Sequence, residues 1–230
     1  MLPSFRDDPA DALAVATEAE RLGIDGVFVY DHLWPMGRPD RPALAPFPLL
    51  GAVAQSTASV RLGTLVARVG VVPDNVLVAE FAALDDLAPG RVVAALGTGD
   101  HLSFAENRAY GVPPGPAEQR RAALRGCARE LLAMGLVVWV GGRSPRTVAV
   151  AEEVGAAVNF WDAGPEDLAA QVGRSEVTWG GMLPEGIGSG AASIASFARP
   201  LARAGTSWLV FGWPLDLRQL AAAADQLRAP

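Results

Sequence analysis

The fold and the candidate site are both indicated by the stretch Gly26-Val27-Phe28-Val29-Tyr30-Asp31-His32-Leu33-Trp34. Its first part, Gly26–Tyr30, is a short run of β-branched and aromatic residues, which is typical of a buried strand. The second part places an acid, an imidazole and an indole at the carboxyl end of that strand, and Pro35 then prevents further strand pairing. A buried strand that ends in such side chains predicts a functional site at its end.

Outward from this stretch, apolar strands alternate with helical segments along the whole chain. Strands are expected at 2–5 as a truncated first strand, and at 26–32, 60–66, 91–96, 136–140, 156–160, 177–179 and 207–211. Helices are expected at 9–22, about 48–56, 75–87, 117–134, 145–154, in a short segment after 164, between 190 and 205 with an interruption or bend at Pro200, and at about 215–227. Asp8-Pro9 and Ser144-Pro145 each have the composition of a helix N-cap followed by proline.

About eight strand–helix units predict a compact single (β/α)8 barrel of the TIM type over residues 1–230, with short insertions. An open, doubly wound sheet also alternates strands and helices, but it normally needs fewer units. No linker or change of composition divides the chain. The sequence therefore favours one α/β domain.

The composition indicates a globular protein that binds neither nucleic acid nor a membrane. Hydrophobic residues make up 50% of the chain and charged residues 19%, which is sufficient for a large core. A net charge of -6 and a pI near 5.0 provide no basic surface for nucleic acid or anionic lipid. The sequence has no apolar run of about 18 residues and no signal-peptide pattern at its start, so the cytoplasm is the expected location.

Residue types that are absent or rare exclude several kinds of chemistry. All basic residues other than histidine are arginines, which excludes Schiff-base aldolases, pyridoxal phosphate enzymes and the P-loop lysine. Cys127 is the only cysteine, so an intramolecular disulfide and a cysteine metal cage are excluded, and its expected helix favours a buried small hydrophobe over a reactive thiol. With only two histidines, His32 and His101, we expect no metal site.

In a barrel of this kind the active site lies at the carboxyl ends of the strands, and both histidines fall there. The candidate catalytic residues are His32, as proton donor or acceptor, and Asp31, which orients His32 or contacts a cofactor. The alternative is that Asp31 caps a turn and His32 packs under the proline-rich loop. His101 follows Gly97–Asp100, whose glycines allow a backbone to approach a ligand closely, or it is simply displayed to solvent.

A second candidate feature is Gly141-Gly142-Arg143-Ser144, which leads into the helix that starts at Pro145. Free N–H groups, the helix dipole, a hydroxyl and a guanidinium converge there, which suits a phosphate, although a glycine pair before a helix is also an ordinary turn. Tryptophans near predicted strand ends indicate either an aromatic barrel mouth or a core or dimer-interface role; these are Trp34, Trp161, Trp179 and Trp213.

Several of these segments together carry a family resemblance. They are Ala19–Gly26 leading to Asp31-His32, Ala54–Thr57 through Arg61–Thr64, Ala79-Glu80 through Leu84–Leu87 to Pro89–Arg91, Leu96–Asp100, and Trp139–Pro145. In this order they resemble the luciferase-like flavin and deazaflavin oxidoreductases, which are (β/α)8 enzymes of monooxygenase and dehydrogenase type. The branch that uses coenzyme F420 is the most similar.

The resemblance implies where a cofactor lies. Asp31 and His32 would sit beside its ring, and a non-proline cis peptide at Leu65-Val66 would back the ring. Cofactor contacts are then expected from Asp31, Thr64, Leu65, Val66, Gly97, Thr98, Gly99 and Asp100, and contacts to the cofactor phosphate from Gly141, Gly142, Arg143 and Ser144. Substrate contacts are expected from Trp34, His101 and Trp161.

The activity implied by the resemblance is that of an F420-dependent oxidoreductase. A hydride would pass between a small organic substrate and C5 of the deazaflavin, with His32 supplying or accepting the coupled proton. The flavin monooxygenases of this superfamily often have an acid followed by two histidines, whereas here Leu33 follows His32, which favours F420 over FMN.

Two other functions stay open at this point. They are an FMN-dependent luciferase-like monooxygenase and a catalytically silent flavin-binding relative. The silent relative is considered because family members usually carry longer insertions near the barrel mouth that cover the substrate. Without them, the substrate pocket is either open or completed by a partner subunit. Dimers are common in the family, and the alanine-rich helix faces would permit a homodimer here.

Overall fold

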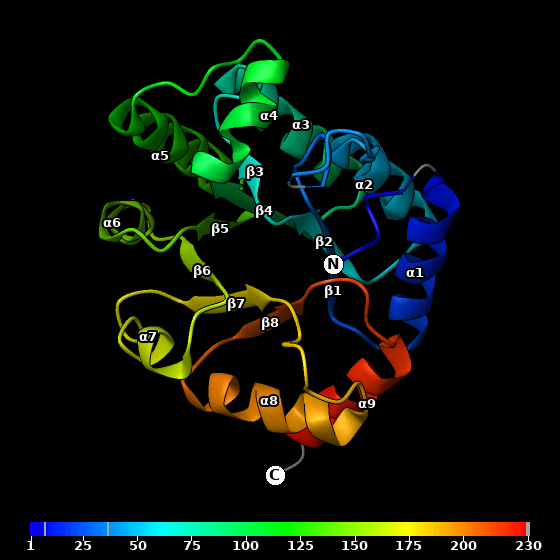
Figure 1. Ribbon diagram of the computed structural model, residues 1–230. Helices are drawn as coiled ribbons and strands as arrows, with labels where there is room; N and C mark the ends of the chain where they lie inside the picture. The colour runs from blue at the N-terminus through cyan, green and yellow to red at the C-terminus, as the bar shows by residue number, and fades with distance from the viewer. Residues whose placement is uncertain (7, 36, 229–230) are drawn as a thin grey trace.

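A computed structural model describes residues 1–6, 8–35 and 37–228 of the chain. A ring of strands occupies its centre and helices surround the ring (Figure 1). The strands follow one another around the sheet in the order β1-β2-β4-β5-β6-β7-β8, with the short β3 paired to β4. All of these pairings are parallel, as expected when a helix returns the chain between successive strands. The predicted (β/α)8 barrel is therefore confirmed.

The strands and helices lie close to their predicted positions. The strands are β1 (Gly26–Val29), β2 (Arg61–Thr64), β3 (Ala67–Arg68), β4 (Val92–Gly97), β5 (Val137–Gly141), β6 (Ala157–Trp161), β7 (Val177–Gly181) and β8 (Trp208–Phe211). The helices are α1 (Pro9–Arg21), α2 (Pro46–Ser56), α3 (Asp74–Leu87), α4 (Phe104–Ala109), α5 (Ala117–Ala133), α6 (Pro145–Val154), α7 (Pro165–Ala169), α8 (Ala191–Arg203) and α9 (Leu217–Arg228). A 3₁₀ turn, η1 (His101–Ser103), precedes α4, so that the connection from β4 to α5 contains an additional helical excursion.

The first residues of the chain join the two ends of the sheet. The nitrogen of Met1 donates to the carbonyl of Phe211 in β8 at 2.6 Å, and that of Leu2 donates to the carbonyl of Phe28 in β1 at 2.7 Å. This segment was predicted as a truncated first strand, but it is not a regular strand, because the N–H of Ser4 turns back to the carbonyl of Leu2 at 2.9 Å. It lies where the ring would otherwise be open between β8 and β1.

Alternate residues of the strands pack into two separate cores. Phe28 points into the barrel, where its ring stacks on that of the fully buried Trp139 with centroids 5.2 Å apart. Its neighbours Val27 and Val29 pack instead against the layer of helices. Because side chains fill the barrel interior, the open positions for a site are at the ends of the strands.

Three sequence predictions about the elements were wrong in detail. The strand predicted at 26–32 ends at Val29. The strand predicted at 60–66 ends at Thr64, and the chain turns at Leu65-Val66 before resuming as β3. The composition of residues 60–66, in which Arg61 and Thr64 interrupt the apolar residues, does not show where the backbone leaves the sheet. Helix α8 continues through Pro200 for three more residues although the proline removes one backbone hydrogen bond, so the predicted interruption is wrong and a bend at Pro200 stays a prediction.

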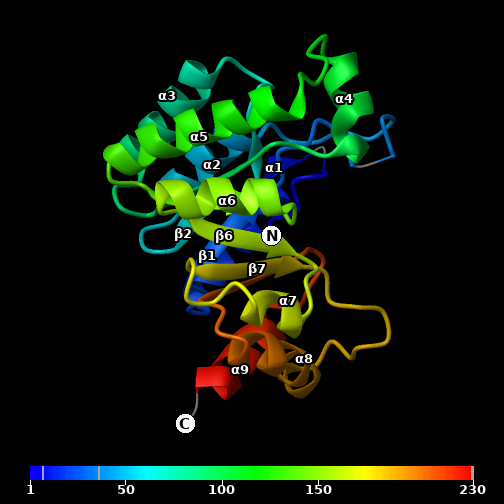
Figure 2. The ribbon, with the colours of Figure 1, turned by 90° about the vertical axis from the view of Figure 1, so that its left-hand side faces the viewer.

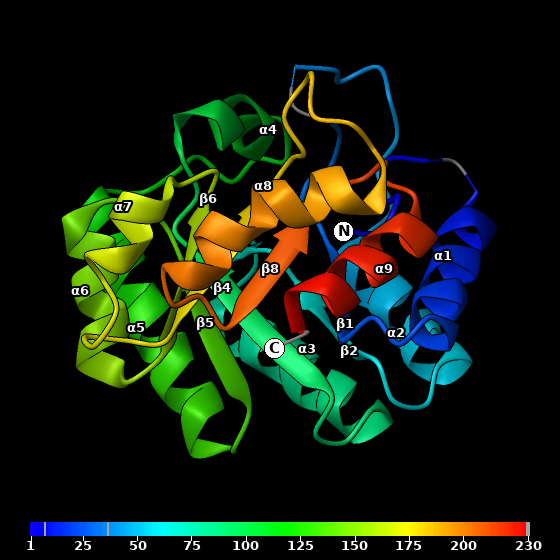
Figure 3. The ribbon, with the colours of Figure 1, turned by 90° about the horizontal axis from the view of Figure 1, so that it is seen from below.

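Several connections project beyond one end of the barrel. Figure 2 shows α4, the described parts of the β1–α2 connection and the β7–α8 loop on the same side of the molecule. In Figure 3 the arrow of β8 points toward this side, which is therefore the carboxyl end of the strands. We call this end the mouth.

Two searches over the described residues found nothing. None of their helices has the length and hydrophobicity needed to cross a membrane. No group of three or more histidine, cysteine, aspartate or glutamate side chains among them is arranged to hold a metal ion.

Candidate active site

Four polar side chains from three segments converge at the carboxyl end of β1. Asp31 and His32 follow β1, Arg68 ends β3, and Glu106 comes from α4. The Nδ1 atom of His32 lies 2.8 Å from Oε2 of Glu106, and Nη2 of Arg68 donates to Oε1 of Glu106 at 2.9 Å. Arg68 also donates to Oδ2 of Asp31, from its backbone N–H at 2.7 Å and from Nε at 3.4 Å. We call these four residues the mouth cluster.

Two side chains of the mouth cluster are buried and two are partly exposed. The side chains of Arg68 and Glu106 are 5% and 3% exposed, whereas those of Asp31 and His32 are 13% and 21% exposed. Burial by itself raises the pKa of Glu106, but hydrogen bonds from His32 and the backbone N–H of Leu33, together with the charge of Arg68, outweigh it and hold the pKa below its usual value. Glu106 is therefore a carboxylate at neutral pH and only accepts hydrogen bonds.

The turn at Leu65-Val66 brings Arg68 into the mouth cluster. The peptide bond between these two residues is cis, which confirms the bond that the family resemblance implied. The hydroxyl of Thr64 donates to the carbonyl of Ala95 at 2.9 Å and accepts from the N–H of Ala67 at 3.2 Å. Because Thr64 is completely buried, its hydroxyl stabilises the turn and is not available for the predicted cofactor contact.

The side chain of Val66 lies over two glycines, one at the end of β4 and one at the end of β5. Gly97 and Gly141 are partners in the register of these strands. A Cβ atom on Gly97 would lie 2.5 Å from Cγ2 of Val66, and one on Gly141 would lie 2.6 Å from Cγ1. Both positions therefore need glycine because Val66 occupies the space of a side chain. Contact of either glycine with a cofactor stays a prediction.

An aromatic wall stands beside the mouth cluster. The ring of Tyr30 stacks on that of Phe5 with centroids 5.2 Å apart and meets that of Trp161 edge-on at 6.0 Å. The imidazole of His32 is 6.4 Å from both Phe5 and Tyr30. Burial and the nearby charge of Asp162 raise the pKa of Tyr30 to about 12, so its phenol keeps its proton at neutral pH. Tyr30, Phe5 and Trp161 together are called the aromatic wall below.

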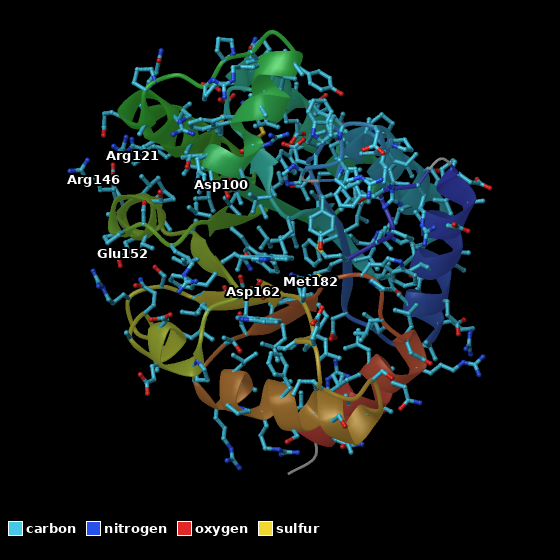
Figure 4. The ribbon with its side chains drawn as sticks, viewed as in Figure 1. Asp100, Arg121, Arg146, Glu152, Asp162 and Met182 are labelled. Carbon is cyan, nitrogen blue, oxygen red and sulfur yellow. The ribbon has the colours of Figure 1, made fainter. Side chains whose placement is uncertain are left out.

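Asp162 follows β6 with an unusual backbone conformation. Its φ of 51° is the only positive value for a residue other than glycine within the described part of the chain. Its N–H donates to the carbonyl of Gly180 at 2.8 Å, and its carboxylate accepts from the N–H of Met182 at 3.2 Å. Figure 4 shows Asp162 and Met182 near the centre of the ring of strands. A carboxylate and a thioether thus lie close to the barrel axis.

The predicted phosphate site at the start of α6 has a well-defined cap. Ser144 is the N-cap, and its hydroxyl oxygen accepts from the N–H of Thr147 at 3.1 Å and lies 2.8 Å from the Thr147 hydroxyl. Arg143 pairs with Asp167 at 3.1 Å on the surface. Gly142 has a φ of 151°, which favours glycine. Pro145 has no N–H, and those of Thr147 and Val148 donate to Ser144, so the N–H of Arg146 and the helix dipole are what this helix end offers an anion.

The predicted residues after β4 lie next to η1. Asp100 caps η1 through its side chain, and His101 begins it with an exposed side chain. Figure 4 shows Asp100 beside α4. The carbonyls of Thr98 and Gly99 accept from Nη1 of Arg120 at 2.8 and 3.3 Å. None of the hydrogen bonds of these residues involves the mouth cluster, and their contacts with cofactor or substrate stay predictions.

The tryptophans divide between the mouth and the core. Trp34 is half-buried, with its ring 6.0 Å from that of Tyr110, and Trp161 belongs to the aromatic wall. Trp179 is 1% exposed and donates from its indole N–H to a backbone carbonyl, so its place is the core. Cys127 is buried as predicted, and burial raises the pKa of its thiol to about 11.

Sequence reasoning missed Glu106 and Arg68. The carboxylate that contacts His32 is that of Glu106 and not, as expected from the sequence, that of Asp31, because the Asp31 carboxylate accepts from Arg68. A signal for Arg68 was present, since it is the one charge in the apolar run Leu65–Val72 and a buried arginine needs acidic partners. For Glu106, nothing in its surrounding sequence indicates which residue it contacts.

The chain is similar to several known proteins. A family described as luciferase-like monooxygenase matches residues 2–134. The F420-dependent glucose-6-phosphate dehydrogenase of Beutenbergia cavernae is 39% identical over 136 residues, which are 59% of this chain and 38% of that protein. The enzyme of the same name from Nakamurella multipartita is 38% identical over 96 residues, which are 41% and 28% of the two chains.

Solved structures share the fold. An F420-dependent secondary alcohol dehydrogenase in complex with an F420-acetone adduct superposes with a TM-score of 0.79 at 16% identity, covering 96% of each chain. The coenzyme F420 dependent tetrahydromethanopterin reductase from Methanopyrus kandleri superposes with a TM-score of 0.72 at 15% identity, covering 97% of this chain and 94% of that one.

The matched segment spans 38% or less of the length of the two curated relatives, whereas the family match extends over more than half of this chain. The chain belongs to the luciferase-like monooxygenase family.

Proposed function

We propose that the protein is a coenzyme F420-dependent oxidoreductase that transfers a hydride between a small organic substrate and the deazaflavin, with His32 as the proton donor or acceptor. The relatives and solved structures that carry F420 in their names support the choice of cofactor. The observation that carries the proposal is the mouth cluster beside Leu65-Val66. It presents one partly exposed imidazole on a set of charges of which Arg68 and Glu106 are buried.

The residues at the mouth fit a flat aromatic ring with an anionic tail. Val66 is only partly buried where it lies over Gly97 and Gly141, which leaves apolar surface at the ends of β4 and β5. The aromatic wall adds further surface of the same kind next to His32. The N-terminus of α6, which follows β5, offers the N–H of Arg146 and the positive end of a helix dipole to a phosphate.

When bound, F420 supplies a centre that accepts or donates a hydride. His32 would give or take the coupled proton at Nε2, because its Nδ1 atom is hydrogen-bonded to Glu106. Arg68 holds the carboxylates of Asp31 and Glu106 in place by donating hydrogen bonds and does not release a proton itself. The aromatic wall and Val66 would limit the access of water and orient the substrate.

The cofactor is tested by parallel titration of the purified protein with F420 and with FMN, following the fluorescence of tryptophan and of the cofactor. Saturable binding of F420 alone is the expected result. Binding of FMN alone would replace the proposal with an FMN-dependent monooxygenase, and binding of neither cofactor would refute it.

The role of His32 is tested by turnover of F420-loaded protein, with secondary alcohols and hexose phosphates as first substrates because the relatives' names contain both. The rate of absorbance change of F420 should fall at least about a hundredfold in His32→Ala. Binding of F420 should persist in this variant. Equal turnover by His32→Ala and the unaltered protein would eliminate His32 as the proton carrier. If the unaltered protein bound F420 but turned over no substrate, it would be a catalytically silent relative.

A further inference from the structure

We propose that Glu106 is a positioning residue which fixes the tautomer and orientation of His32, so that Nδ1 carries the proton directed to the protein and Nε2 faces the mouth. The importance of Glu106 for catalysis rests on the proposed function. Which nitrogen of the imidazole carries the proton does not depend on a cofactor.

The first step of the argument is the pairing itself. Oε2 of Glu106 lies 2.8 Å from Nδ1 of His32, and both side chains are largely removed from solvent. An ionised carboxylate has no proton to donate, so a hydrogen bond between these atoms requires a proton on Nδ1. In a neutral imidazole the other nitrogen, Nε2, then has the free lone pair.

The second step is that Glu106 is itself held on its other oxygen. Oε1 accepts from Nη2 of Arg68 at 2.9 Å and from the backbone N–H of Leu33, the residue after His32. The carboxylate therefore joins the ring of His32 to the backbone that carries it. Nη1 of Arg68 donates to Asn107 at 2.8 Å, which connects the guanidinium to the residue after Glu106 as well.

The third step is the charge of the mouth cluster. Asp31, Glu106 and Arg68 together carry one net negative charge when His32 is neutral, and the cluster becomes neutral when His32 takes a proton. Because Arg68 and Glu106 are buried, the arrangement suits an imidazole that alternates between the two states during a hydride transfer.

The proposal is tested by Glu106→Gln, because the two oxygens of Glu106 accept hydrogen bonds from different donors. Glutamine offers one acceptor oxygen where glutamate offers two, and the Oε1 position receives two donors, from Arg68 and Leu33. The glutamine oxygen should occupy that position, which directs its NH₂ group at His32. Nδ1 would then have to accept, and the neutral imidazole should change to the tautomer protonated on Nε2.

The tautomer is measured by ¹⁵N NMR of the cofactor-free protein, at a pH high enough that the imidazole is neutral. A His101→Asn background leaves His32 as the single histidine. The expected pattern is a protonated Nδ1 in the reference protein, a protonated Nε2 in Glu106→Gln, and a protonated Nδ1 in Glu106→Asp, which keeps both acceptor oxygens. A protonated Nδ1 in Glu106→Gln would overturn the proposal, as would identical spectra of the Gln and Asp variants.

Kinetics of the F420-loaded protein supply the second readout. In Glu106→Gln, kcat should fall at least about tenfold while KM and F420 affinity stay within about twofold, and Glu106→Asp should recover most of the rate. A matched control is Glu20→Gln, because Glu20 also accepts several hydrogen bonds but lies at the opposite end of the barrel. Its donors are the N–H groups of Ala58, Ser59 and Val60. This control should change neither the tautomer nor kcat.

The two readouts separate the possible failures. Absence of F420 binding in the unaltered protein would refute the proposed function, and the tautomer pattern would still decide the role of Glu106. Normal turnover in Glu106→Gln together with a changed tautomer would show that Glu106 orients His32 without importance for the reaction, which would overturn the catalytic part of the inference.

Discussion

Replacing Gly97 by alanine is the most direct test of the packing that supports the mouth. Gly97 lies in the regular strand β4, so its backbone conformation accepts alanine, and only the space for the new methyl group is in question. The Cβ atom would lie 2.5 Å from Cγ2 of Val66, about 0.9 Å closer than the 3.4 Å at which ordinary contacts begin. The methyl group must therefore displace Val66, because the backbone of β4 is fixed on both sides by β2 and β5.

Overpacking of this kind lowers the free energy of unfolding by about 1–3 kcal/mol. Val66→Ala alone should lower it by roughly 1–2 kcal/mol, because two partly buried methyl groups are lost. In the double variant the shortened side chain at position 66 leaves room for the methyl group added at position 97, so the two losses should not add. We expect the double variant to be at least about 1 kcal/mol more stable than the sum of the single effects.

The measurement is urea-induced unfolding of the unaltered protein, the two single variants and the double variant, followed by tryptophan fluorescence and circular dichroism. Gly126→Ala is the matched control, since Gly126 lies inside α5 with no atom near the position of its Cβ, and it should raise stability by about 0.5–1 kcal/mol. F420 affinity should fall in Gly97→Ala and stay unchanged in Gly126→Ala. A loss under about 0.5 kcal/mol in Gly97→Ala, or additivity within that margin, would refute the role assigned to Val66.

Three other side chains test the electrostatics of the fold. Hydrogen bonds, first of all from the backbone N–H of Ser59, lower the pKa of Glu20 to about 2. Its contribution to stability is present above the unfolded value of 4.5 and is lost as the pH falls toward 2, so the difference in urea midpoint between the unaltered protein and Glu20→Gln should shrink over that range. Cys127, with its raised pKa, should react with Ellman's reagent far more slowly in the native than in the unfolded chain. Arg143→Ala should alter stability by less than about 1 kcal/mol, because its pair with Asp167 is exposed, yet weaken F420 binding measurably.

The fold could be predicted because its signals are local and repeated. Each strand is a short apolar run, and caps such as Asp8 and Ser144 mark the helix starts where the sequence predicts them. The segment that closes the barrel is also predicted, as a truncated strand, although its hydrogen bonds to β1 and β8 depend on the finished ring. Where the local sequence has no turn signal, as in residues 60–66, the prediction missed the end of β2 at Thr64.

The site could be predicted only in part because its contacts are not local. His32 and Asp31 are identified by their position at the end of a strand, but the partner of His32 is 74 residues away in the chain. The glycines at the ends of β4 and β5 suggested a ligand, whereas the group that occupies the space beside Gly97 and Gly141 is Val66. Periodicity places a residue on an element and does not determine which residue of another element it meets.

The two acids of the mouth cluster have different partners. Asp31 accepts from the backbone N–H and Nε of Arg68, and the acid that contacts His32 comes from another segment. The excursion that contains α4 supplies it. These contacts also give Arg68 its function, because a single guanidinium that donates to both Asp31 and Glu106 fixes the two carboxylates relative to each other and hence the imidazole relative to the mouth. An Asp31→Asn variant should accordingly disturb Arg68 first and His32 only through Glu106.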